Sequence, residues 1–501
     1  MEEPNTAKPE RGVAVLVAAL LLAGAHQYLF YGKMPGVSIP IFVGLLYVFM
    51  MYYAKDALRE MNVAGYAGLG VIVLLAMTFA LFANPVFRAL NMLVLPVLIL
   101  VHMTYMLSYR RPEWSGLKLI GAAAEHLFPQ TLHQIGASFS QIRRKGGDAV
   151  RDERKQVMVK VLIGLGISAP LLIIVVSLLS SADGVFSETL NRVPQLLERI
   201  SFGEGAARTL WVLLLGGGLF GLVLGFAQPK TFDWNTGLPE MENKQAYEPV
   251  SFGFDPVVMI TVLASVNMVY LLFVSVQFSY LFGAWDGLLP EGSTYADYAR
   301  SGFLELVLVT GINFIILLLS LSALSKARSL LHKATSILLY ILVLCSLVML
   351  YSAFSRLLLY EEAYGYTYIR FLVHAFMIML GLAMLLTAVR ISKTDFPLAK
   401  CYIVLGLSSY VLMNYIGMDN IIAAQNIKRY EDSGVVDADY LTRLSWDAVP
   451  RLAEFSRSEG GILEQGLREK WDGEAQRHQP WASYNLARQQ GRQALEQDFN
   501  P

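Results

Sequence analysis

The sequence is poor in charge and in cysteine, and each shortage excludes a class of protein. Only 16% of its 501 residues are charged, whereas soluble globular domains carry about a quarter. Basic and acidic residues number 40 each, so there is no net positive charge of the kind that binds nucleic acid. The two cysteines, Cys345 and Cys401, lie in or beside apolar runs and form neither a disulfide framework nor a metal-binding spacing.

The common catalytic and cofactor motifs are missing as well. We find no P-loop, no G-x-G-x-x-G after a strand, no H-E-x-x-H, no G-x-S-x-G and no C-x-x-C. The glycine run at 216–218 lies inside an apolar stretch, where small residues let two helices approach closely. No histidine has a second ligand at helical spacing. We therefore expect no cofactor and no bound metal, and a non-enzymatic role is favoured.

Long apolar runs are what the sequence has in abundance. Hydrophobic residues make up 55% of the chain, and many runs reach the roughly 20 residues that a membrane-spanning helix needs. The sequence predicts an all-α, polytopic transmembrane helix bundle. Its eleven expected spans are residues 12–31, 36–54, 64–83, 86–108, 158–180, 207–227, 254–282, 301–325, 334–354, 370–390 and 399–418.

The distribution of lysine and arginine predicts the orientation. Cytoplasmic loops are enriched in these residues. The richest connection is 109–157, and further basic residues lie near 55–59, 230–244, 326–333 and 390–400. All of them fall on one side if the N-terminus is cytoplasmic. The tail after residue 418 is then extracytoplasmic.

Four regions follow from this division. Residues 1–108 form an N-terminal four-span membrane region, and 109–157 form a basic cytoplasmic loop that is partly amphipathic. Residues 158–418 form a seven-span membrane domain. Residues 419–501 form a polar, helical C-terminal tail, in which Ser445, Asp447 and Pro450 are typical of a helix start.

Polar residues inside or beside the spans are the candidate functional site. Ionisable groups are costly within a bilayer, so they tend to face the bundle interior. In the expected topology, four spans bring such side chains to one outer-leaflet layer, where they could line a shared cavity. A salt-bridge and hydrogen-bond network, such as Glu305 with Arg370, is the alternative. The candidates are Tyr298, Arg300, Glu305, Asn313, Glu361, Thr367, Arg370, His374, Asn414 and Gln277.

Several blocks of sequence occur together in a family pattern. They are SADGVF (181–186), VQFSYLFGAWDGL (276–288), TYADYARSGFLELVLVTGIN (294–313), YEEAYGYTYIRFLVHAFMI (360–378), MNYIGMDNIIAAQNIKRY (413–430), DYLTRLSWDAVPRL (439–452) and PWASYNLARQQGRQAL (480–495). In this order they resemble a bacterial family of multi-pass membrane proteins of unknown function, family 4173. The resemblance implies a bacterial plasma-membrane protein and supplies no activity.

Three functions fit these observations. The first is a non-enzymatic envelope component that binds a partner or signals through its tail and outer polar layer. The second is a secondary transporter of a small solute, although no internal repeat of the kind many transporters have is present. The third is a membrane-embedded enzyme acting on a lipid-linked envelope substrate, with Glu305 or Glu361 as general base. The expected partners are membrane lipids and a membrane or envelope protein, not nucleic acid.

Overall fold

A computed structural model describes residues 9–144, 204–230, 256–285, 303–324, 329–475 and 480–499. These residues are helical, with turns and no strand among them, which confirms the predicted all-α class. In a bilayer, only a helix satisfies the backbone hydrogen bonds of a single isolated segment, so each long apolar run becomes one. The chain divides into two compact units.

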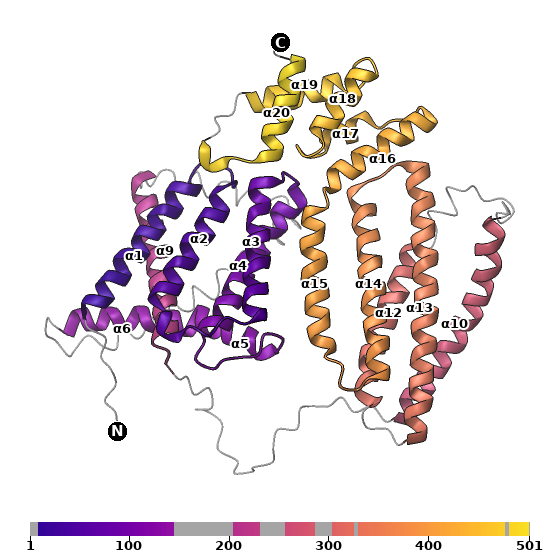
Figure 1. The fold of residues 1–501 in the computed structure, drawn as a ribbon, viewed down its shortest axis with the longest axis horizontal. Coiled ribbons are helices and arrows are strands. Elements are labelled where there is room, and N and C mark those ends of the chain that lie inside the picture. Colours follow the sequence, from indigo (N-terminus) through magenta and orange to yellow (C-terminus); the bar gives the residue numbers. More distant parts are fainter. Residues whose placement is uncertain are drawn as a thin grey trace, which may run out of the picture. The chain divides into compact units, whose positions relative to one another are not determined.

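The first unit comprises residues Met1–Leu81, Arg88–Thr236 and His478–Asn485. Its apolar helices pack side by side, and α5, η2 and α6 follow α4 at one end of them (Figure 1). The elements are α1 (Pro9–Phe30), α2 (Ser38–Tyr53), η1 (Lys55–Ala57), α3 (Val63–Leu81), α4 (Pro85–Leu107), α5 (Leu117–Glu125), the π-helix η2 (His126–Gln130), α6 (Thr131–Arg144), α9 (Glu204–Ala227) and η4 (Trp481–Ser483).

The basic connection expected at 109–157 is helical from Leu117 to Arg144, and the residues beyond Arg144 lie outside the described ranges. It packs against α9, where the imidazole of His126 stacks on the ring of Phe226 with centroids 4.1 Å apart. The side chain of Gln130 donates a 2.5 Å hydrogen bond to the carbonyl of Lys230 beyond the end of α9. Burial, together with the positive charge of the nearby Arg110, lowers the pKa of His126 to about 4. His126 is therefore a neutral packing residue at neutral pH.

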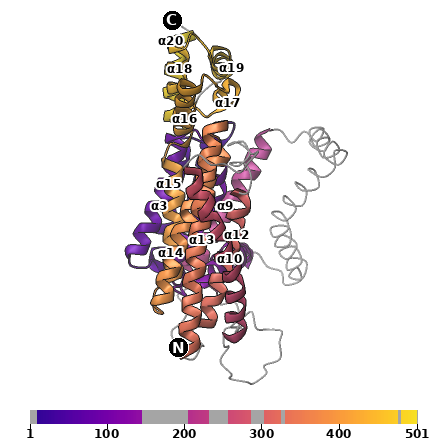
Figure 2. The ribbon, with the colours of Figure 1, turned by 90° about the vertical axis from the view of Figure 1, so that its right-hand side faces the viewer.

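The second unit comprises Phe82–Phe87, Gly237–Arg477 and Leu486–Pro501. Its long helices are α10 (Pro256–Trp285), α12 (Phe303–Leu324), α13 (Ser329–Tyr364), α14 (Tyr368–Ser392) and α15 (Leu398–Tyr415). Five shorter helices then gather at one end of these helices, as both views show (Figures 1 and 2). They are α16 (Met418–Ser433), α17 (Ala438–Arg443), α18 (Val449–Ser458), α19 (Glu464–Ala475) and α20 (Leu486–Phe499).

We call α16–α20 the C-terminal module. It has a hydrophobic core of its own, to which Leu441, Leu452 and Leu467 contribute side chains that are 0–1% exposed. Gly417 separates α15 from α16, which meet at 59°. Its φ of +73° lies in the left-handed region that glycine adopts without steric cost. The sharp bend takes the chain out of the apolar bundle and into the module.

Seven helices among the described residues have the length and hydropathy to cross a membrane, and an eighth is added if α15 and α16 form one bent span. Two shorter apolar helices are Ser38–Tyr53 and Glu305–Leu321. A helix therefore occupies each predicted span except 158–180, which lies outside the described residues, as does the expected outer helix at 181–206. These long apolar helices indicate a multi-pass membrane protein. The count of eleven spans and the orientation in the membrane stay predictions.

Candidate functional site

Asn313 is buried in the second unit and joins three helices. Its side-chain carbonyl accepts a 2.6 Å hydrogen bond from the hydroxyl of Tyr270 on α10. Its amide nitrogen donates a 2.9 Å bond to the hydroxyl of Ser346 on α13. The side chain is 0% exposed. The hydrogen-bonding groups of this buried amide are thus paired with side chains of the two neighbouring helices, as is usual for a buried polar group.

Glu361 and His374 form a buried pair between α13 and α14. The carboxylate Oε2 of Glu361 lies 3.0 Å from Nε2 of His374, and Glu361 is 2% exposed. The expected spans 334–354 and 370–390 place Glu361 in the connection between them. The structure differs, because α13 continues to Tyr364 and includes Glu361. The ring of Phe354 packs edge-on against the imidazole, with centroids 4.4 Å apart.

Thr367 and Arg370 lie at the start of α14. Thr367 is the N-cap residue, with an extended backbone of φ −135° and ψ 162°, and its carbonyl accepts the N–H of Phe371 at 3.0 Å. The guanidinium of Arg370 donates to the carbonyl of Gly365 and lies 4.2 Å from the ring centroid of Tyr360. Arg370 therefore binds its own connection and an aromatic face, and not the carboxylate of Glu305 that the sequence suggested.

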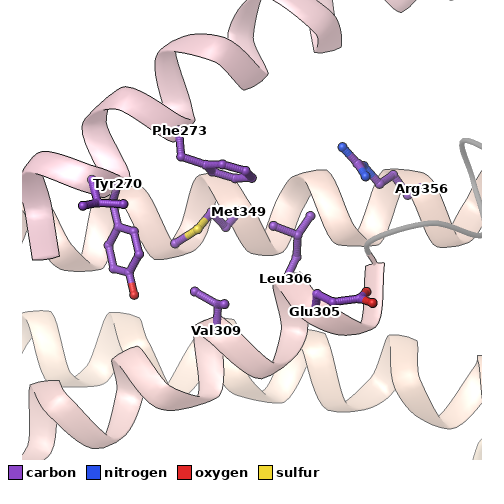
Figure 3. A pocket seen from close by; sticks show the side chains of 8 residues that line it. Tyr270, Phe273, Glu305, Leu306, Val309, Met349 and Arg356 are labelled. Atoms are coloured by element: carbon purple, nitrogen blue, oxygen red, sulfur yellow. The ribbon is translucent and has the colours of Figure 1, made fainter. Parts of the chain in front are cut away.

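Glu305 lies in the first turn of α12 and lines a cavity of about 330 Å³ between α10, α12 and α13. Arg356 reaches the same end of this cavity from α13 (Figure 3). The remaining walls are apolar or aromatic: Val269, Tyr270, Phe273, Leu306, Val309 and Met349. Arg356 was not among the predicted site residues, although its place inside an apolar run is the same signal that selected Glu305.

The other candidates fall elsewhere. Asn414 is 5% exposed and donates a 2.9 Å hydrogen bond to the carbonyl of Tyr410 on its own helix. Tyr298 and Arg300 lie outside the described residues, and Gln277 lies in the part of α10 whose side chains are not described. Among the predicted residues that are described, Glu305 is the one that lines the cavity, whereas Asn313, Glu361 and Arg370 are held in separate contacts.

A buried carboxylate that the sequence analysis did not select organises the base of the C-terminal module. Asp419, in the first turn of α16, is 1% exposed. It accepts hydrogen bonds from the amide of Asn84 at 2.5 Å, from the backbone N–H of Ser445 at 2.9 Å and from the hydroxyl of Tyr368. The three donors come from the 82–84 connection, the 444–448 turn and α14. We call these four residues the Asp419 cluster.

Further polar contacts extend the Asp419 cluster. The carboxylate of Asp447 accepts bonds from the hydroxyl of Ser445 at 2.6 Å and from the N–H of Ala83 at 2.9 Å. Burial raises the pKa of Asp447. The ammonium of Lys470 on α19 donates a 2.5 Å bond to the carbonyl of Leu444, and burial lowers its pKa to about 8. These groups fix the turn that leads into α18.

No group of three or more potential metal-ligating side chains forms within the described ranges.

Comparison with known families identifies the family of the chain. It belongs to a family described as Domain of unknown function (DUF4153). The match covers residues 69–455. The family number 4173 suggested by the resemblance is not confirmed, although a family of unknown function is. No curated protein and no solved structure matches the chain.

Proposed function

We propose that this protein is an integral protein of a bacterial plasma membrane and a partner-binding or signalling component of the cell envelope. The observation that carries the proposal is the C-terminal module, a folded body fixed to α14 through the buried Asp419. A surface that is already ordered loses little conformational entropy when a partner binds. A rigid module at one end of a membrane bundle therefore suits a receptor or scaffold.

The arrangement of basic residues supports an N-in, C-out orientation with eleven spans. In the first unit, the N–H of Arg59 bonds the carbonyl of Met106 at 2.8 Å, and its guanidinium bonds the carbonyl of Pro112 at 3.3 Å, so the α2–α3 connection lies beside the end of α4 and the basic residues Arg110 and Arg111 that follow it. In the second unit, Arg390 lies in the last turn of α14 and Lys393 follows directly after it, at the end of α14 away from the module. The positive-inside rule assigns these basic ends to the cytoplasm.

Cysteine labelling in intact cells tests this orientation. Cys345 and Cys401 are first replaced by alanine or serine, and one cysteine is then introduced at an exposed position. Ile462→Cys lies on the module and Ile120→Cys lies on α5, where the two isoleucines are 36% and 60% exposed. A membrane-impermeant maleimide should label the first in intact cells and the second only after permeabilisation. The inverse pattern would overturn the orientation.

Photocrosslinking tests the partner-binding role. A photoreactive amino acid at Ile462 should give a discrete crosslinked species with a membrane or envelope protein in living cells. Asp419→Ala should abolish the species because it loosens the module. Asn420→Ala is the matched control, since the neighbouring Asn420 is exposed and bonds Arg451 at the surface. Absence of any crosslinked species, or a species unaffected by Asp419→Ala, would contradict the proposal.

A further inference from the structure

The cavity between α10, α12 and α13 is amphipathic along its length. The carboxylate of Glu305 and the guanidinium of Arg356 occupy one end, and Tyr270 lies at the other (Figure 3). Between them, Phe273, Leu306 and other apolar side chains form the walls. The polarity therefore changes from doubly charged to hydrocarbon over a short distance, which is the pattern of an amphiphile with a charged head and an acyl chain.

The position of the charged end along the helices fits a membrane lipid. Glu305 is in the first turn of α12, where the helix begins, so it lies near one membrane interface. Val309 is one turn further into α12, toward Asn313, whose side-chain carbonyl accepts a hydrogen bond from the Tyr270 hydroxyl. A lipid lying in the bilayer also has its head at the interface and its chain directed inward. This match holds whichever side of the membrane the end faces.

The cavity borders the outer surface of the helices. On α10, the lining residues Val269 and Phe273 are 62% and 37% exposed, so they also face the surroundings in which lipid would lie. The volume of about 330 Å³ is at the lower end of the range for ligand sites, about 300–1,000 Å³. It accommodates a segment of one acyl chain, with the head group at the end formed by Glu305 and Arg356.

We propose that this cavity binds a zwitterionic phospholipid of the phosphatidylethanolamine class. The ammonium group of the head pairs with Glu305, and the phosphate accepts hydrogen bonds from Arg356, whose guanidinium has five N–H donors and can serve a protein partner at the same time. One acyl chain lies along Leu306, Val309 and Met349. A purely anionic head group has no cation for Glu305 and is repelled by its carboxylate. The pair of opposite charges therefore selects the zwitterion.

Native mass spectrometry of the full-length protein, purified in detergent and stripped of lipid, tests the proposal. Phosphatidylethanolamine and phosphatidylglycerol with identical acyl chains are added in parallel. The wild type should bind phosphatidylethanolamine about tenfold more tightly, since tenfold corresponds to one charge-assisted contact. Glu305→Gln changes no volume and should bring the two affinities close together. A wild type that binds both lipids equally, or prefers phosphatidylglycerol, would overturn the assignment.

A pair of tryptophan substitutions on α12 separates binding in the cavity from lipid coating of the surface. Val309→Trp fills the cavity and should weaken phosphatidylethanolamine binding at least about tenfold. Leu308→Trp adds the same bulk at a neighbouring residue that is 59% exposed and does not line the cavity, so it should bind as the wild type does. Equal binding by both variants refutes the site. If Val309→Trp fails to fold by circular dichroism, the Glu305→Gln comparison decides alone.

Discussion

Replacing Asp419 by alanine should detach the C-terminal module from its support. The carboxylate is 1% exposed and accepts three hydrogen bonds. A hydrogen bond to a charged group contributes about 1.5–3 kcal/mol, and each buried donor left without a partner costs about 1–3 kcal/mol. Because the donors at Asn84, Tyr368 and Ser445 all lose their acceptor, we expect a loss of about 3–5 kcal/mol in the local free energy of unfolding, similar to breaking a buried ion pair.

Hydrogen exchange of the full-length protein in detergent measures this loss. A change of about 3 kcal/mol accelerates exchange from the opened state on the order of 10²-fold. The acceleration should appear in peptides from α17 and α18, while the apolar core of α13 keeps its protection. Asn420→Ala, at an exposed position, should change exchange there less than about fivefold, as surface substitutions change stability little. Unchanged exchange in Asp419→Ala would refute the idea that this carboxylate holds the module.

Three further changes test other parts of the structure. Burial lowers the pKa of Lys470 to about 8 in the folded protein. Between about pH 8 and 10 the Lys470 side chain therefore carries its proton in the unfolded chain but not in the folded one. The thermal stability of the wild type should rise with pH in this window, and that of Lys470→Met should stay flat. A Tm that falls between pH 8 and 10 in the wild type, or an equal slope in both proteins, would contradict this. Gly36→Ala places a Cβ atom 2.5 Å from the carbonyl of Tyr484, so proteolysis near 480–485 should speed up, whereas Gly44→Ala, with open space around it, should have no such effect. Asn313→Leu removes hydrogen bonds to two helices and should lower the free energy of unfolding by about 1–3 kcal/mol, measured by thermal melting; no change would show that these bonds add nothing.

The helices were predictable from the sequence because each apolar run forms its hydrogen bonds within itself. The helix at α9, for example, follows from residues 207–227 alone, without knowledge of its neighbours. The ends were harder to predict. α13 extends ten residues beyond the span expected at 334–354, to Tyr364. Polar residues such as Glu361 are good helix formers, so an apolar run marks the membrane-crossing part of a helix and not its end.

The site was less predictable because spacing along one helix does not say which other helix a side chain meets. Glu305 and Arg370 were matched by depth, yet Arg370 binds Gly365 in its own connection. Asn84 and Asp419 are 335 residues apart in the chain and form a direct hydrogen bond. The signal for Asp419 was present, since an acid follows directly after an apolar span, but nothing in its local sequence indicates its donors.

The blocks that carried the family resemblance gain a physical meaning from the Asp419 cluster. Block 360–378 supplies Tyr368, block 413–430 supplies Asp419, and block 439–452 supplies Ser445. Three separate stretches thus meet at one buried carboxylate and hold the module. Replacing Asp419 leaves both donors without their acceptor. Likeness over these three blocks therefore reports how the module is held in place, whereas block 294–313 supplies Glu305 to the cavity that it lines with Arg356.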